Sequence, residues 1–230
     1  MFEITVILSC LITIVLLKIF LNINFSNLKQ LQKRNSVELE KLSSKFPEDE
    51  QICKEILGSL GNKEVKIKIE PDYTSCLYTV FNNTITIGKF QQNYMKLQTI
   101  AHECIHSCQN KKTLWSNFIF TNIYLIYFAA ILILELLNRL SYSNIHIIIL
   151  IFLSFTQYIL RNTLESDAML RAKYVAKQYI EDNKILDKEQ EKNLLTEYDE
   201  INNIGIPFIN YYTLCMNIIK IIIFSFIVLI

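Results

Sequence analysis

Long apolar stretches limit what this chain can fold into more than any other feature of its sequence. Ile4–Ile23 is almost wholly apolar over about 20 residues, enough to cross a bilayer as a helix. Two further stretches, Phe118–Leu137 and Ile145–Leu160, are separated by a short polar connection at 138–144. Together they predict a membrane hairpin.

Each stretch has a second interpretation. Ile4–Ile23 could be a signal peptide, but no basic region precedes it and no small-residue cleavage site follows it, which favours an uncleaved anchor. The hairpin stretches could be two buried helices of a soluble core, although they are apolar on every side rather than along one stripe. Asn210–Ile230 is interrupted by Lys220, so it predicts either a fourth span or a segment lying partly in the membrane interface.

The stretches divide the 230 residues into five regions. We expect an N-terminal transmembrane anchor at 1–24, a soluble helix and strand region at 25–117, a transmembrane hairpin at 118–160, a helical segment at 161–209 and a C-terminal transmembrane helix at 210–230. The predicted fold class is a mainly α membrane protein with about four transmembrane helices and a small α+β part.

Basic residues orient this arrangement. Lys111 and Lys112 precede the hairpin, and Arg161 follows it, whereas the tip contains Arg139 alone. By the positive-inside rule, the polar regions face the cytoplasm. The formal net charge of +1 leaves no basic excess for nucleic-acid binding. The apolar stretches make the lipid bilayer an expected partner. None of the six cysteines forms a Cys-x-x-Cys pair, which agrees with a reducing compartment.

Local patterns predict the elements of the polar regions. Helices are expected over 28–45, 48–60, 89–112, 162–181 and 187–202. The strands form a short three-stranded sheet.

Apolar residues alternate with charged ones over 63–70, which predicts the first, half-buried strand. The other two strands, 76–81 and 84–88, flank Asn82 and Asn83. Because Asn tolerates positive φ, this pair predicts a two-residue hairpin turn.

The helix expected at 89–112 contains the sequence His-Glu-Cys-Ile-His, the H-E-x-x-H arrangement of zinc peptidases. His102 and His106 lie one turn apart, so both imidazoles face the same way and can share one Zn²⁺. Glu103 lies about 100° further round the helix, where it can accept a proton from the attacking water and deliver it to the leaving amine. A helix with two hydrogen-bonded histidines and no metal is the alternative.

A third ligand must come from another segment. His146, the remaining histidine, is expected on the outer side, where it cannot reach the pair. Glu165 and Asp167 follow the hairpin, and a two-span hairpin returns the chain to the face that it left. Glu165 is therefore the expected third ligand, unless it belongs to a capping box that begins at Asn162.

Other polar side chains lie near these ligands. Gln109 shares the histidine face of the helix and is expected to hydrogen-bond near the metal. Asp167 either orients a metal ligand or forms a surface ion pair with Arg171. Cys104 and Cys108 face away from the histidines, so we expect both to serve in packing.

Two segments resemble the YugP-like family of membrane-bound neutral zinc metallopeptidases. Residues 101–109, AHECIHSCQ, are similar to that family's A-H-E-x-G-H-A-x-Q, and 165–172 are similar to its E-x-D-A-S-x-R-A. The order of anchor, metal helix, apolar spans and Glu helix also matches, and it resembles the HtpX-type membrane zinc proteases more distantly. The resemblance implies a zincin-like catalytic part in which zinc is bound by His102, His106 and Glu165, with Glu103 as the catalytic residue.

We therefore expect a multi-pass integral membrane zinc endopeptidase with its site on the cytoplasmic side. Its substrates would be peptides or proteins, membrane-proximal or unfolded. Thr84–Ile87 could be an edge strand to which they add, or it could pair in the ordinary way within the small sheet. A catalytically inactive zinc-binding membrane scaffold or adaptor is the alternative. Structural zinc usually has four protein ligands, whereas three leave a position for water, which favours the peptidase. The sequence does not predict the oligomeric state.

Overall fold

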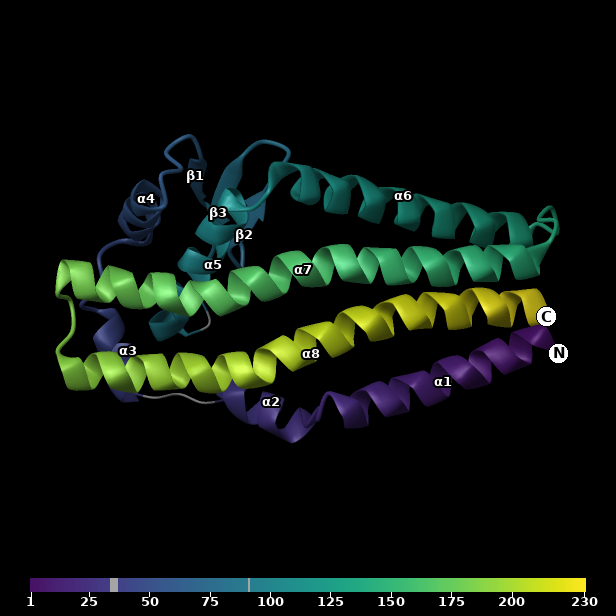
Figure 1. Ribbon diagram of the computed structural model, residues 1–230, viewed down its shortest axis with the longest axis horizontal. Coiled ribbons are helices and arrows are strands. Elements are labelled where there is room, and N and C mark those ends of the chain that lie inside the picture. The colour runs from purple at the N-terminus through teal and green to yellow at the C-terminus, as the bar shows by residue number, and fades with distance from the viewer. Residues whose placement is uncertain (34–36, 91) are drawn as a thin grey trace. The chain divides into compact units, whose positions relative to one another are not determined.

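The computed structural model describes residues 1–33, 37–90 and 92–230, most of which are helical. The elements in chain order are α1 (Phe2–Phe20), α2 (Phe25–Lys33), α3 (Val37–Ser43), α4 (Asp49–Ser59), β1 (Lys66–Ile69), β2 (Leu77–Thr79), β3 (Thr84–Ile87), a 3₁₀ turn (Asn93–Met95), α5 (Lys96–Cys108), α6 (Lys111–Leu136), α7 (Ser143–Asn183) and α8 (Lys188–Leu229) (Figure 1).

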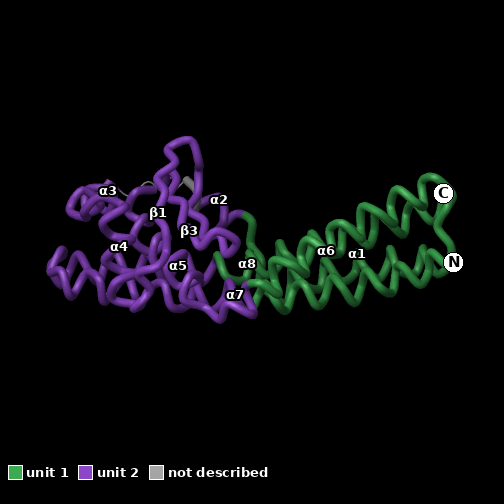
Figure 2. Tube along the Cα trace, turned by 90° about the horizontal axis from the view of Figure 1, so that it is seen from above, with its two compact units in different colours: residues 1–25, 115–163, 205–230 green, residues 26–114, 164–204 purple. Residues whose placement is uncertain are grey.

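The chain divides into two compact units, which Figure 2 distinguishes by colour. The first unit comprises residues 1–25, 115–163 and 205–230. The second comprises residues 26–114 and 164–204.

Among the described residues, four helices, α1, α6, α7 and α8, are long and apolar enough to cross a membrane. Many of their large apolar side chains are uncovered; Ile126 is 68% exposed and Phe152 is 67% exposed. Helices of a soluble core would bury such side chains, so their exposure favours a multi-pass membrane protein over the soluble alternative. The prediction of four helices of membrane length is confirmed.

The hairpin helices α6 and α7 are joined by residues 137–142, and α7 then continues without interruption to Asn183. The helix predicted at 162–181 is therefore not separate. Because α7 is already helical at Asn162, it has no N-terminus there, and the capping-box interpretation of Glu165 is wrong.

α8 also joins two segments that the sequence separates. The helix predicted at 187–202 and the apolar stretch at 210–230 form one helix, with Pro207 inside it. Asp187 begins this helix, because its Oδ1 accepts hydrogen bonds from the backbone N–H groups of Glu189 and Gln190.

The second unit contains a three-stranded sheet in the order β1-β3-β2. β1 pairs with β3 in parallel, and β2 pairs with β3 antiparallel. Thr84–Ile87 is thus the central strand, and the prediction that it offers an edge to a peptide is wrong. The edges of the sheet are β1 and β2.

The turn between β2 and β3 also differs from the prediction. Thr79 pairs with Thr84, so four residues, 80–83, connect the strands rather than Asn82 and Asn83 alone. Asn83 has a φ of 51°, in the left-handed region that Asn tolerates. The prediction that Asn adopts positive φ in this turn is confirmed at Asn83, but the loop is two residues longer than predicted.

Three predicted helices of the second unit can be compared with the structure. α4 confirms the helix at 48–60. The helix predicted at 28–45 is represented by α2 and α3, and its residues 34–36 lie outside the described residues. The helix predicted at 89–112 includes residue 91, which is not described, and it is wrong at both ends, because α5 begins at Lys96 and ends at Cys108.

α7 contributes a stripe of small residues to the core of the second unit. Ala168, Ala172 and Ala176, spaced four residues apart, are all 0% exposed, and Leu164 before them is 5% exposed. Residues at this spacing share one helix face, and alanine allows close approach of the neighbouring elements. The face adjoins Glu165, so its packing fixes where this carboxylate lies.

Candidate metal centre

The structure brings His102 and His106 of α5 together with Glu165 of α7, all within the second unit. The two Nε2 atoms are 3.0 Å apart, and Glu165 Oε2 lies 3.5 Å from that of His102 and 3.7 Å from that of His106. Zinc bonds of 2.0–2.1 Å in a tetrahedral site place ligand atoms about 3.3 Å from one another. The three side chains therefore fit a zinc-sized ion, and they form a group that could hold a metal.

Gln109 determines which nitrogen of His106 faces this group. Its Nε2 donates hydrogen bonds to the carbonyl oxygen of Leu164 at 2.7 Å and to Asp167 Oδ2 at 2.9 Å. Both partners are acceptors only, so the amide oxygen must face His106, whose Nδ1 lies 2.8 Å away. His106 therefore donates from Nδ1 and leaves the lone pair of Nε2 for a metal.

The side chain of Gln109 can contact both His106 and α7 because α5 ends immediately before this residue. Its backbone is extended, with φ of −66° and ψ of 164°, and α6 begins two residues later. Asn110 supports the new start, since its Oδ1 accepts hydrogen bonds from the backbone N–H groups of Lys112 and Thr113. This break was not predicted, although Asn before a helix is a recognised capping signal.

Asp167 has both of the contacts that the sequence left as alternatives. Its Oδ2 accepts the hydrogen bond from Gln109, and Arg171 Nη1 lies 3.4 Å from the same oxygen. The surface ion pair and the bond towards a metal ligand are therefore parts of one chain of contacts, which runs from Arg171 through Asp167 and Gln109 to His106.

Glu103 is buried, with 7% of its surface exposed, and its Oε2 accepts a hydrogen bond of 2.6 Å from the backbone N–H of Tyr78. Burial raises the pKa of Glu103, while the nearby His102 and His106 and the Tyr78 bond oppose that rise. Sequence reasoning could not identify Tyr78 as a partner, because a backbone amide carries no residue-specific signal.

The ligand side chains influence one another's protonation. Burial disfavours a charged carboxylate, yet the imidazoles of His102 and His106, 3.5 and 3.7 Å away, hold the pKa of Glu165 well below its usual range. Burial also disfavours a charged imidazole, but the nearby carboxylates of Glu165 and Glu103 raise the pKa of His106. Both directions indicate that the site attracts a positive charge.

Three other predicted residues are not members of this group. Cys104 is 0% exposed, and its sulfur is 3.7 Å from that of Cys53, which confirms its packing role. Cys108 is exposed, so the prediction that it packs is wrong. His146 belongs to the first unit, where its Nδ1 lies 2.7 Å from the hydroxyl of Tyr127.

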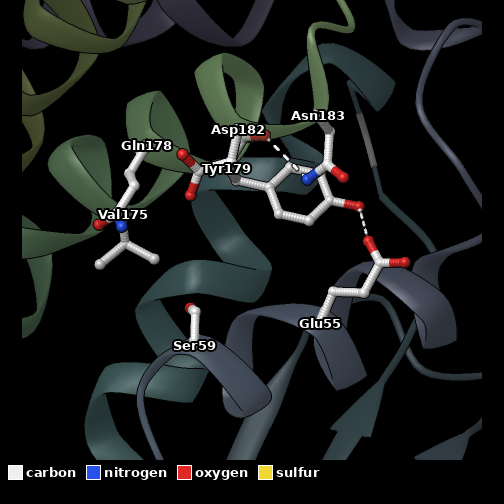
Figure 3. Close-up of a pocket in the computed structure, with 7 residues that line it drawn as sticks. All are labelled: Glu55, Ser59, Val175, Gln178, Tyr179, Asp182 and Asn183. Atoms are coloured by element: carbon white, nitrogen blue, oxygen red, sulfur yellow. Dashed lines mark hydrogen bonds between the residues drawn. The ribbon is translucent and has the colours of Figure 1, made fainter.

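A small cavity of about 90 Å³ lies elsewhere in the second unit, between α4 and α7 (Figure 3). Its lining includes Glu55, Asp182 and Tyr179, whose hydroxyl donates to Glu55 Oε2 at 2.5 Å. Because none of the metal-centre residues lines this cavity, it is a separate feature.

Comparisons of the chain with known protein families, with curated proteins and with solved structures find no match.

Proposed function

We propose that the protein is an integral membrane zinc endopeptidase. The observation that carries the proposal is the convergence of His102, His106 and Glu165 beside the Glu103 of an H-E-x-x-H sequence. Among the described residues, this group contains three ligand side chains. Zinc usually has four ligands, so one position is left for water and substrate, as in catalytic zinc sites. A structural site would usually fill that position with a fourth side chain.

Each residue has a role in the proposed reaction. Glu103 accepts a proton from the water that attacks the peptide carbonyl and returns it to the leaving amine. The hydrogen bond from the Tyr78 amide holds one carboxylate oxygen of Glu103, and burial raises the pKa of Glu103 towards the range useful for a general base. Zn²⁺ held by the three ligands would supply a Lewis acid that polarises the carbonyl and acidifies water.

The substrate is proposed to add to the sheet as a strand at β2. This is an edge of the sheet, and its Tyr78 amide contacts the catalytic Glu103. An extended peptide at such an edge gains main-chain hydrogen bonds and presents its carbonyls in register. We therefore propose β2, rather than β3, as the strand that binds the peptide substrate.

Membership of the YugP-like family and a cytoplasmic site are part of the same proposal. They rest on the two motif segments at 101–109 and 165–172 and on the basic residues that flank the hairpin. Substrates that are membrane-proximal or unfolded would suit the small second unit, which offers little surface for a large specificity domain.

The proposal is tested with the full chain purified in detergent. Bound zinc and casein cleavage are measured for wild type, Glu103→Gln and Glu165→Ala. We expect Glu103→Gln to retain zinc and lose cleavage, and Glu165→Ala to lose both.

Cleavage by Glu103→Gln at the wild-type rate would reject the mechanism. Wild type that binds zinc but leaves casein and a panel of unfolded membrane-protein fragments intact would instead favour the inactive scaffold or adaptor.

A further inference from the structure

Lys220 lies within the apolar half of α8, and its ammonium group points into the first unit. Nζ is 3.2 Å from Asn217 Oδ1 and 4.5 Å from the ring centroid of Tyr124. Asn217 in turn donates hydrogen bonds to the carbonyl of Ser154 at 3.1 Å and to Gln157 Oε1 at 2.9 Å. Lys220 therefore joins a polar network between α6, α7 and α8 and does not extend to a helix end, as a snorkelling lysine would.

Every residue of the first unit is described, and no acidic side chain of this unit balances the charge of Lys220. Its two acidic side chains are Glu3 and Glu135. Glu3 lies 3.2 Å from the N-terminal ammonium, and Glu135 accepts a hydrogen bond from Ser143 at 2.8 Å. An aromatic ring and an amide oxygen attract the ammonium group of Lys220, but they leave its net charge in place.

The depth of Lys220 limits what could balance it. With these helices taken as membrane spans, the helical rise places Lys220 about 14 Å from the end of α8, and Tyr124 and Ser154 about 17 Å from the hairpin tip. In a hydrocarbon core about 30 Å thick, this is close to the midplane. Lipid phosphates and fatty-acid carboxylates lie at the membrane surface, so the carboxylate that can reach this depth is one carried on a polypeptide helix.

Lys220 also lies at the border between a covered and an uncovered face of α8. The helical rotation of about 100° per residue places the residues of these two faces on either side of it. Residues on one side are at most 4% exposed: Asn217, Ile221 and Phe224. Residues on the other side are 40–41% exposed: Met216, Ile219 and Ile223. The side chain can keep its inward contacts while the ammonium meets a group at the uncovered face.

We propose that Lys220 and this uncovered face of α8 bind a transmembrane helix of a partner protein that carries an Asp or Glu at mid-depth. The positive charge of Lys220 favours an acidic partner residue, and the depth of Lys220 in the membrane requires that this residue lie on a transmembrane helix. A second copy of this chain does not provide the group, because Glu3 and Glu135 lie at helix ends. The inference does not depend on the metal centre.

The test measures energy transfer between the full chain in phosphatidylcholine nanodiscs and synthetic transmembrane peptides at pH 8, with a chelator present to prevent cleavage. The peptides are Leu/Ala helices that differ only at the central residue, which is Asp, Asn or Leu. We expect the Asp peptide to bind at least about tenfold more tightly than the other two.

Lys220→Met should reduce binding of the Asp peptide to the level of the Leu peptide, while Lys18→Met, near the end of α1, should leave it unchanged. Lys220→Glu should bind a peptide with a central Lys, which excludes simple misfolding as the cause of loss. Equal binding of all three peptides to wild type, or unchanged binding by Lys220→Met, overturns the proposal.

Discussion

The amide oxygen of Gln109 lies 2.8 Å from Nδ1 of His106, and the same side chain donates to two acceptors on α7. Gln109 thereby connects a proposed ligand on α5 to the helix that carries the third ligand. Partners of this kind orient the imidazole and increase its basicity.

Replacing Gln109 with alanine is therefore expected to weaken zinc binding by about 10- to 100-fold, because His106 loses its orienting acceptor. Chelator competition on the purified protein measures the change. Gln178→Ala, which removes an exposed glutamine from α7, is the matched control and should bind zinc as wild type does. A wild-type affinity for Gln109→Ala would show that the bond does not position the ligand.

Zinc affinity is expected to rise with pH through the neutral range. Burial opposes a charge on His106, but Glu165 and Glu103 raise its pKa above the ordinary value of about 6.5. Below the raised pKa the imidazole keeps a proton that zinc must displace, and above it this competition ends. Chelator competition between about pH 6 and 9 tests whether zinc affinity rises with pH. Glu103→Gln, which is expected to retain zinc, should move the pH dependence to lower pH because it removes one of the charges that raise the pKa of His106. An affinity that does not change with pH would contradict the prediction.

Gly88→Ala should lower the free energy of unfolding by about 1–3 kcal/mol. A Cβ at this position would collide with the backbone carbonyl oxygen of Ser75 and lie 2.6 Å from that of Tyr73. Gly58 is the matched control, since nothing lies within 4 Å of the same added atom and the residue is in α4. Gly58→Ala should stabilise the protein by about 0.5–1 kcal/mol, because alanine loses less backbone entropy in a helix. Thermal unfolding in detergent compares the two, and equal melting temperatures would contradict this account.

Ala172→Leu should destabilise the second unit by about 1–3 kcal/mol and weaken zinc binding, because a larger side chain forces α7 away from the core that places Glu165. Ala172 is 0% exposed, whereas Tyr174 on the same helix is 68% exposed. Tyr174→Leu puts a leucine on the opposite face and should change neither quantity. Unfolding and zinc titration of both variants test the prediction, which fails if Ala172→Leu retains the wild-type zinc affinity.

The sequence predicted those features that depend on local composition and spacing. His102 and His106 are one turn apart in any α-helix, and a two-span hairpin must return Glu165 to the side of the histidines. Gln109 was placed near the ligands because it shares their helix face. In each case helical geometry or chain connectivity alone decides the outcome.

Features that depend on distant partners were missed. The parallel pairing of β1 with β3 made Thr84–Ile87 a central strand, and no local pattern distinguishes a central strand from an edge in so short a segment. The bond from Tyr78 to Glu103 involves a backbone group that every residue has. The end of α5 at Cys108 was not predicted, because the composition stays helical across the break and the capping residue Asn110 is its local signal.

The residues of the candidate metal centre are separated in chain order by α6 and the first part of α7. A nascent polypeptide that ends before residue 165 carries the two imidazoles but lacks the carboxylate. The complete donor set exists only after α6 and the first part of α7 have been synthesised. In the proposed zinc enzyme, metal loading would therefore follow translation of the hairpin, and a shorter ribosome-bound chain would lack the third donor.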